Sequence, residues 1–242
     1  MGIPIARLTL REISNIVIDL IEKRGKKTFF YVNAHCLNIA NRDPIYQKIL
    51  QRADLVYAGG MGPILASKIL GNPLWERTPT PDFIDDVFVA AIKNKWSFYL
   101  LGGEEGVAGD AAEGLRKRFH GLKIVGYHHG FFTNNSEVSQ KINQVKPDII
   151  LVGMGTPKQE KWIENNMDQI NAKTFWAVGA LFDVLSGKRK RAPKWMQKLG
   201  LEWVFRLIQE PGRLWKRYLI GNIIFLITVF QKKLSFSQRS VP

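Results

Sequence analysis

The chain has 242 residues, of which 45% are hydrophobic, and a formal net charge of +14. This length and apolar content suit one sizeable α/β domain, with room for an appendage. The single cysteine, Cys36, excludes an internal disulfide framework and fits a reducing cytoplasm. The first residues lack a long apolar segment followed by small residues, so no signal peptide is expected.

The positive charge is concentrated near the end of the chain. Residues 187–242 contain thirteen Lys or Arg against two acids, Glu202 and Glu210. A basic tail predicts a polyanionic partner, which could be nucleic acid, anionic lipid or a pyrophosphate-containing substrate. Charge alone does not choose among these three.

Predicted helices and strands alternate along the chain. Apolar residues at helical spacing over 8–24 predict a first helix, which Gly25 ends. Short apolar runs predict strands at 28–32, 54–58, 96–101, 123–127, 148–152 and 174–178. Helices are expected between them, among them 63–70, 82–94 and 136–145. This alternation predicts a Rossmann-like α/β fold, with a doubly wound and mostly parallel sheet.

The turn after the fifth predicted strand has the features of an anion site. Gly153 and Gly155 allow a sharp turn, and Thr156-Pro157 is typical of an N-cap and a first helical residue. Free backbone N–H groups and the helix dipole would then face a phosphorylated ligand. Thr156 and Gln159 also have the spacing of a capping box, in which Gln159 only closes the helix end.

Two other motifs are weaker. Gly102–Gly106 resembles a dinucleotide turn, but the next strand ends at Tyr127-His128-His129 instead of an acid for the ribose, so NAD is not expected. The two histidines lack further ligands at metal spacing, so no metal site is expected.

The tail contains an apolar run over 218–230. Its thirteen residues fall short of the roughly 20 that a helix needs to cross a bilayer. Lys216, Arg217, Lys232 and Lys233 flank it, which favours an amphipathic helix lying in the interface of an anionic membrane. The alternative is a helix packed on the core or at a subunit contact.

Motifs along nearly the whole chain resemble the WecG/TagA/CpsF glycosyltransferases (glycosyltransferase family 26). The matching pieces are Asn33-Ala34-His35, Gly60-Met61-Gly62, Glu76-Arg77, Lys158-Gln159-Glu160, Val178-Gly179-Ala180-Leu181-Phe182-Asp183, Glu202-Trp203-Val204-Phe205-Arg206-Leu207 and Glu210-Pro211-Gly212-Arg213. The resemblance implies a Rossmann-like core, residues 1–190, that binds a UDP-sugar with no metal or other cofactor. It also implies an appendage, residues 191–242, that docks near the active site and helps to place the enzyme on the cytoplasmic membrane.

The activity implied by the resemblance is inverting transfer of a sugar from UDP to a sugar on polyprenyl pyrophosphate. An N-acetylhexosamine such as N-acetylmannosamine is the expected donor sugar, in the synthesis of a cell-surface polysaccharide or teichoic acid. The enzyme is then cytoplasmic and peripheral on the inner face of the membrane, with an anionic membrane surface as a partner. A homo-oligomer is possible, and no nucleic acid is expected.

The resemblance also assigns site residues. Arg77 and Gln159 match positions tied to activity. Substrate-binding positions are Asn33, Gly59, Gly60, Gly62, Gly153, Gly155, Asp183, Arg206, Arg213 and Arg217, with Lys216 as an alternative to Arg217. Arginine suits this task because negative charge grows on the departing UDP, and a guanidinium matches a pair of pyrophosphate oxygens.

One position departs from the family pattern. Members usually carry Asp before Gly-Met-Gly as the general base, whereas this chain has Gly59. Asp82 is predicted to replace that base, unless it only caps the helix from Phe83. An inactivated variant, or a natural member with little turnover, would also explain Gly59. Tyr31 stands where a small hydroxyl such as Thr is common, and its ring would contact the ligand or fill the core.

The sequence leaves two further classes of function open. A nucleic-acid-binding protein would use the basic, aromatic tail, but the apolar run over 218–230 has no role on a phosphate backbone, and no recognition motif is present. A catalytically silent scaffold that holds UDP-sugar or lipid-linked sugar is the other alternative, and Gly59 is the reason for it.

Overall fold

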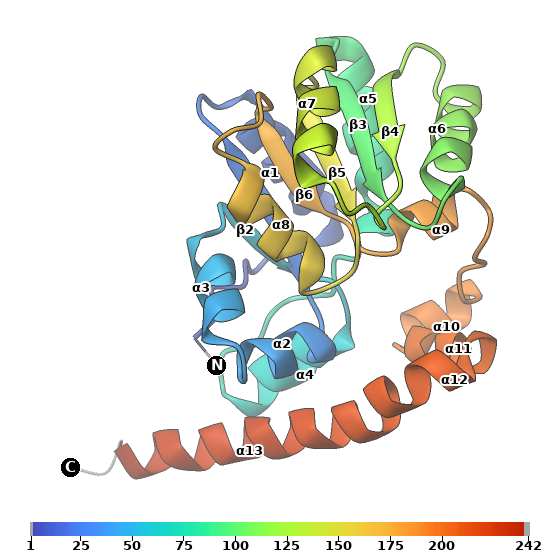
Figure 1. Ribbon diagram of the computed structural model, residues 1–242. Helices are drawn as coiled ribbons and strands as arrows, with labels where there is room; N and C mark the ends of the chain where they lie inside the picture. The colour runs from blue at the N-terminus through green and yellow to red at the C-terminus, as the bar shows by residue number, and fades with distance from the viewer. Residues whose placement is uncertain (1, 240–242) are drawn as a thin grey trace.

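A six-stranded, all-parallel sheet forms the centre of the computed structural model, which describes residues 2–239 (Figure 1). The strand order is β2-β1-β6-β5-β3-β4. The strands are β1 (Lys27–Val32), β2 (Leu55–Ala58), β3 (Ser97–Gly102), β4 (Lys123–His128), β5 (Ile149–Gly153) and β6 (Thr174–Ala177). The predicted α/β class and parallel sheet are confirmed, and each strand lies within two residues of its predicted range.

Helices cover both faces of the sheet, which is why β2, β3, β5 and β6 are buried along their whole length. One face packs against α1 (Leu10–Glu22), α5 (Ile84–Asn94) and α6 (Val107–Arg118). The other packs against α2 (Ala34–Ala40), α3 (Pro44–Arg52), α7 (Asn135–Val145) and α8 (Lys158–Asn166). Trp176 lies at the centre of the first layer, stacked on Phe83 with a centroid distance of 5.8 Å.

Shorter elements surround the carboxyl ends of the strands. They are α4 (Met61–Ile69), a 3₁₀ turn (Thr80–Asp82) and α9 (Leu181–Leu185). Sequence periodicity missed α2 and α9, because seven and five residues are too few to show a helical repeat. Asn33 begins α2, with its side-chain oxygen accepting from the backbone N–H of Cys36 at 3.2 Å.

From Lys194 to Arg239 the tail consists of helices, some of them joined by short turns. It contains α10 (Lys194–Lys198), α11 (Glu202–Gln209), α12 (Pro211–Trp215), a π-helical turn (Lys216–Ile220) and α13 (Gly221–Arg239). Helices α10 and α11 are separated at Gly200, which has a φ of +73°, a conformation that favours glycine. Figure 1 shows α13 lying along α2 and α4, and Phe225 and Val229 are buried there in the second core layer. No helix within residues 2–239 is long and apolar enough to cross a membrane.

Two predicted caps are wrong. Helix α8 begins at Lys158 after Pro157 and has no side-chain cap, since Thr156 and Gln159 are engaged elsewhere. Helix α5 also has no side-chain cap, because Asp82 belongs to the 3₁₀ turn and forms ion pairs with Arg77 and Arg191. The division of the chain at residue 190 stays a prediction.

Candidate active site

The turns that follow β1, β2, β5 and β6 meet at one edge of the sheet. Parallel strands bring their carboxyl ends to the same edge, where α/β proteins bind ligands. Glycines allow the backbones to approach closely there: a Cβ added at Gly62 would lie 2.8 Å from the backbone nitrogen of Ala34. Gly155 and Gly179 have φ values of +79° and +56°, a conformation that favours glycine. This edge faces the helices of the tail.

Two cavities lie between this edge and the tail. The smaller, about 190 Å³, is formed by the turns after β5 and β6 and by basic residues of the tail. The larger, about 630 Å³, lies between α2, α4, α11 and α13. The cavities share a wall, which is formed by Asn33, Gly59, Glu202, Arg206 and Arg217. A ligand in one cavity is therefore next to a ligand in the other.

The smaller cavity is strongly cationic. Its basic lining residues are Arg189, Lys190, Arg191, Arg206, Arg213 and Arg217. Arg206 and Arg217 have no carboxylate partner among the described residues, and the Nε atom of each is buried without a hydrogen bond. A buried N–H donor without a partner is costly unless an acceptor such as an anion binds it. The cavity is therefore suited to a phosphate or diphosphate group.

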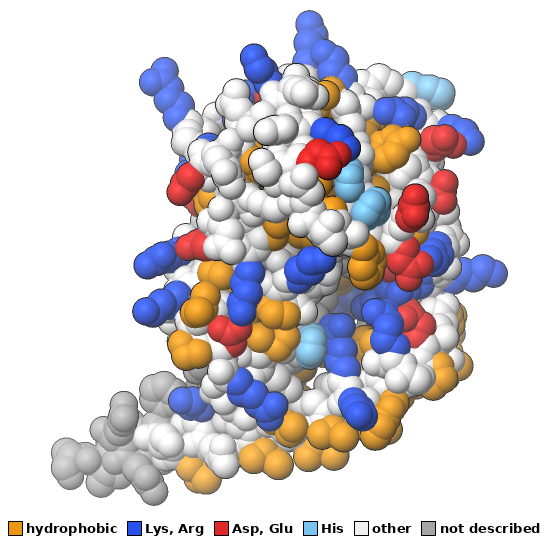
Figure 2. Space-filling view, in the orientation of Figure 1, with side chains coloured by type: hydrophobic (Ala, Val, Ile, Leu, Met, Phe, Trp, Pro, Cys, Tyr) orange, Lys and Arg blue, Asp and Glu red, His pale blue; other side chains and the backbone are white. Residues whose placement is uncertain are grey.

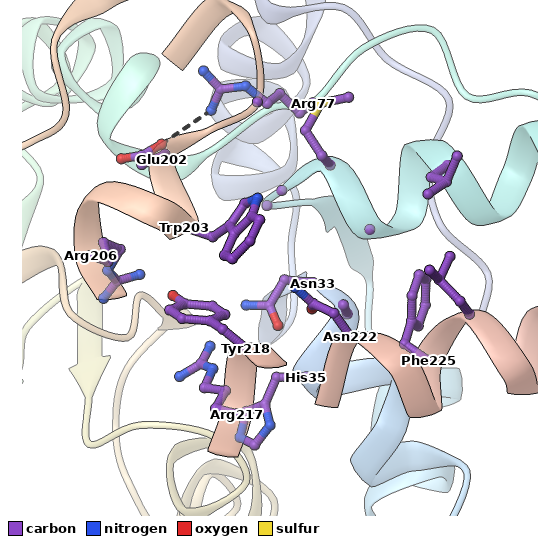
Figure 3. A pocket seen from close by; sticks show the side chains of 18 of the residues that line it. Asn33, His35, Arg77, Glu202, Trp203, Arg206, Arg217, Tyr218, Asn222 and Phe225 are labelled. Atoms are coloured by element: carbon purple, nitrogen blue, oxygen red, sulfur yellow. Dashed lines mark hydrogen bonds and ion pairs between the residues drawn. The ribbon is translucent and has the colours of Figure 1, made fainter. Parts of the chain in front are cut away.

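The larger cavity combines polar and apolar walls (Figure 3). Asn33 and His35 of α2, together with Asn222 of α13, supply polar side chains, and Trp203 and Tyr218 supply aromatic rings. Leu219, Ile223 and Phe225 line the end formed by α13. Burial, reinforced by Arg217, lowers the pKa of His35 to about 4, so its imidazole is neutral at neutral pH.

Most predicted site residues line these cavities. Asn33, Gly59, Arg206 and Arg217 line both. Gly60, Gly62 and Arg77 line the larger cavity, and Gly155 and Arg213 line the smaller. Arg77 is held by Glu202 at 3.4 Å and by Asp82 at 3.8 Å. The structure therefore brings together residues that lie up to 184 positions apart, from Asn33 to Arg217.

The other four predicted residues line neither cavity and lie behind residues that do. Gln159 is fully buried, and its side-chain oxygen accepts from the backbone N–H of Gly179 at 3.0 Å. Asp183 pairs with Arg189 at 3.1 Å, and the two oxygens of Asp82 pair with Arg77 and Arg191. Gly153 packs closely on the next turn, since an added Cβ would lie 2.7 Å from the carbonyl oxygen of Gly179. Asp82 therefore holds two arginines in place, and its role as the base stays a prediction.

Gly59 and Tyr31 fit together. A Cβ at Gly59 would lie 2.8 Å from Cδ2 and 3.0 Å from Cβ of Tyr31, so this ring occupies the space beside the glycine. The hydroxyl end of the ring lies against Gly179, where an added Cβ would be 2.3 Å from it. Tyr31 lines the smaller cavity. The ring therefore fills the space beside Gly59 and also lines the smaller cavity.

Sequence reasoning missed two carboxylates at this site. Glu202 is the single Asp or Glu among the described residues that line the cavities, and it pairs with Arg77 and Arg191. Glu160 is fully buried and accepts from Thr156 and Gln159, each at 2.9 Å. Burial raises the pKa of Glu160 to about 7. Both residues stood in the motifs quoted for the resemblance, but nothing in their spacing distinguished them. No group of metal-ligating side chains occurs in the described part of the chain.

Comparison with known proteins identifies the family. The model of the glycosyl transferase WecG/TagA/CpsF family matches residues 1–239. Curated relatives from Staphylococcus aureus strains MRSA252, MW2 and NCTC 8325 are each 30% identical over 244 residues, covering 100% of this chain and 93% of the relative. Each is named N-acetylglucosaminyldiphosphoundecaprenol N-acetyl-beta-D-mannosaminyltransferase. The family expected from the sequence motifs is thus confirmed.

Proposed function

Because the chain belongs to the WecG/TagA/CpsF family of glycosyltransferases, we propose that it moves a sugar from UDP to a sugar carried on polyprenyl diphosphate. The observation that supports this most is the pair of cavities joined at Asn33 and Gly59. One cavity is small and cationic, and the other is larger and partly apolar. Two substrates bound there would meet at the shared wall.

The donor is assigned to the smaller cavity. Its unpartnered guanidinium groups, Arg206 and Arg217, suit the diphosphate of UDP, and the turn at Gly155 offers backbone N–H groups. In a single displacement, the acceptor oxygen attacks the anomeric carbon while the bond to UDP breaks, which inverts the configuration. Negative charge then grows on the departing UDP, and cationic groups fixed beside it lower the barrier.

The acceptor is assigned to the larger cavity. Asn33, His35 and Asn222 can hydrogen-bond a sugar, and Leu219 and Ile223 can contact the first part of a lipid chain. The relatives' printed name supplies the specific pair, N-acetylmannosamine as the transferred sugar and N-acetylglucosaminyl-diphospho-undecaprenol as the acceptor. The same pair is proposed for this chain.

The outer face of α13 is assigned to the membrane surface. While Phe225 and Val229 face the core, apolar side chains at helical spacing face solvent: Leu219, Ile223, Ile227, Phe230 and Leu234. Figure 2 shows hydrophobic side chains along this edge of the molecule, with Lys and Arg beside them. An apolar stripe of this kind, near exposed Lys232 and Lys233, suits shallow insertion into an anionic leaflet. Placement at the cytoplasmic face follows from the lipid-linked acceptor.

A transfer assay tests the proposal. UDP-N-acetylmannosamine is mixed with a synthetic N-acetylglucosaminyl-diphospho-polyprenol, and both UDP release and the disaccharide-lipid are measured. We expect the product to form only when both substrates are present. Arg206→Ala should lose most of this activity, whereas Arg52→Ala, an exposed arginine on α3, should retain it. UDP binding without any product would favour a binding protein over a transferase.

Vesicle flotation tests the membrane surface. Ile223→Asp places a charge on the outer face of α13, and Val89→Asp is the matched control, because both side chains are 60% exposed and Val89 lies on α5. Removing one isoleucine from the bilayer costs roughly 2 kcal/mol, so Ile223→Asp should weaken binding to phosphatidylglycerol vesicles at least about tenfold. Equal binding by the two variants would contradict the assignment.

A further inference from the structure

Neither cavity offers a free carboxylate beside Gly59. The space there is occupied by the Tyr31 ring. Glu202, the carboxylate in the lining, is paired with Arg77 and Arg191, and Asp82 lines neither cavity. The low pKa of His35 makes its imidazole a weak proton acceptor. A proton leaving an acceptor hydroxyl at this wall therefore needs another destination.

A chain of hydroxyl groups leads from the cavity to a buried carboxylate. Burial raises the pKa of the Tyr31 phenol, and the side chain of Thr156 lies close enough to oppose that rise; both residues line the smaller cavity. The hydroxyl of Thr156 donates its proton to Oε1 of Glu160 at 2.9 Å. Because a threonine hydroxyl has only one proton, Thr156 is then the acceptor toward Tyr31. The direction of these bonds points from the cavity toward Glu160.

Glu160 is the buried carboxylate at which this series of hydroxyl groups ends. It has no exposed surface, and its Oε2 atom has no hydrogen-bond partner. Gln159 donates to its other oxygen at 2.9 Å and is itself fixed by Gly179. The titratable groups that face it are Tyr31 of β1, Cys36 of α2 and Tyr46 of α3, with the charge of Arg217 acting on Tyr31 and Cys36. A buried carboxylate with spare acceptor capacity is a suitable proton acceptor.

We propose that Tyr31, Thr156 and Glu160 form the proton path of this transferase, replacing a carboxylate at position 59. The inference rests on the proposed function. As the acceptor oxygen bonds to the anomeric carbon and the bond to UDP breaks, the acceptor's proton passes to the Tyr31 oxygen. Tyr31 gives its own proton to Thr156, and Thr156 gives its proton to Glu160. Glu160 ends protonated, UDP leaves with the electron pair, and the proton is later returned to solvent by the reverse path.

The three residues have different roles. Tyr31, which lines the smaller cavity, is proposed as the catalytic residue that receives the proton of the acceptor hydroxyl. Thr156 and Glu160 act through it and are positioning residues. Burial raises the pKa of the Tyr31 phenol, so the phenol stays neutral. It receives the proton of the acceptor and at the same time donates its own proton to Thr156. The path needs ionised Glu160, and its pKa of about 7 places the change of rate near neutral pH.

The pH dependence of kcat tests the path, with UDP-N-acetylmannosamine and the synthetic lipid acceptor. The unaltered chain should show kcat rising through a pH of about 7. Tyr31→Phe keeps the ring but removes the hydroxyl, and should lower kcat about 10²-fold, the lower end for a positioned base. Thr156→Val and Glu160→Gln should have the same effect and abolish the rise. Tyr46→Phe, a buried phenol outside the cavities, should keep kcat within about twofold.

Two further measurements separate this role from a structural one. The Kd for UDP, measured by calorimetry, should change by less than about threefold in Tyr31→Phe, because the ring remains. Combining Tyr31→Thr with Gly59→Asp makes room for a carboxylate at position 59. Adding Glu160→Gln to this pair should then lower kcat by less than about threefold, because the proton no longer passes to Glu160.

The outcomes are distinct. Full kcat in Tyr31→Phe, or a rise of kcat through neutral pH that persists in Glu160→Gln, would overturn the proton path and leave the proposed function intact. A lack of transfer by the unaltered chain, with UDP still bound, would overturn both.

Discussion

The fit between Gly59 and Tyr31 predicts that a carboxylate cannot simply be restored at position 59. In Gly59→Asp the new Cβ would lie 2.8 Å from Cδ2 and 3.0 Å from Cβ of Tyr31, closer than carbon atoms pack. The ring cannot retreat, because its other end lies against Gly179. Overpacking of this kind typically costs about 1–3 kcal/mol. For a chain of this size, a loss of about 2 kcal/mol lowers Tm by roughly 4–8 °C.

A double-mutant cycle measures the coupling. Urea unfolding of the unaltered chain, Gly59→Asp, Tyr31→Thr and the combined variant gives the interaction free energy between the two positions. We expect the combination to be more stable than Gly59→Asp alone, with a coupling of about 1–3 kcal/mol. Gly60→Ala is the matched control, since an added Cβ there meets only Cβ of Asn33 at 3.5 Å, an ordinary contact. A Gly59→Asp protein as stable as the unaltered chain would refute the reasoning.

Three other predictions follow from the site. Arg206→Ala or Arg217→Ala should weaken UDP binding at least about tenfold in calorimetry, because each removes a charge-assisted contact; an unchanged Kd would place the diphosphate elsewhere. Asp82→Asn should raise KM for the lipid acceptor through Arg77 and keep kcat within about threefold; a large loss of kcat alone would restore Asp82 as the base. The third concerns Glu160. Its folded pKa is raised from 4.5 to about 7, so the folded chain loses stability as pH rises across that interval. The free energy of unfolding of Glu160→Gln minus that of the unaltered chain, measured in urea, should therefore be about 3 kcal/mol larger at pH 8 than at pH 5. An equal difference at both pH values would contradict the raised pKa.

The sheet could be predicted because most of its strands are continuous apolar runs, four of them buried along their whole length. Ile149–Gly153, for example, is a continuous apolar run between Pro147 and the Gly153-Met154-Gly155 turn. The order of the strands was not predictable, because strands that are far apart in the sequence can be neighbours in the sheet. Strand β1, for example, pairs directly with β6. Helix α2 was also missed. Its N-cap, Asn33, was interpreted only as a substrate-binding residue and not as the start of a helix.

The sequence motifs indicated residues that line the cavities, but not the contacts through which other residues act on their neighbours. Asn33, Arg206 and Arg217 line both cavities, as their motifs indicated. Gln159 was expected either to cap its helix or to contact ligand, whereas its side chain fixes Gly179. Local spacing cannot show such a contact, because Gly179 lies 20 residues further along the chain. Ion pairs of Asp82 with Arg77 and Arg191 depend on tertiary packing in the same way.

Some of the basic residues near the end of the chain form ion pairs within the protein, whereas composition alone suggested that they bind a polyanionic partner. In the segment before α10, Arg189 and Arg191 are half-buried, whereas Lys188 and Lys190 are exposed. Arg189 joins Asp183 of the core to Glu210 of the tail, at 3.1 and 2.7 Å. Arg191 likewise joins Asp82 to Glu202.

These bridges explain why an enzyme with so large a positive charge needs two glutamates in its tail. Glu202 and Glu210 pair with Arg77, Arg189, Arg191 and Arg213, which fixes the helical tail over the edge of the sheet. Arg206 and Arg217, on the same helical segments, are left without carboxylates at the wall shared by both cavities. The arginines paired with carboxylates hold the tail in place, whereas Arg206 and Arg217 lie without carboxylates where a diphosphate would bind. The tail therefore acts less as a general polyanion-binding surface than as one wall of the active site.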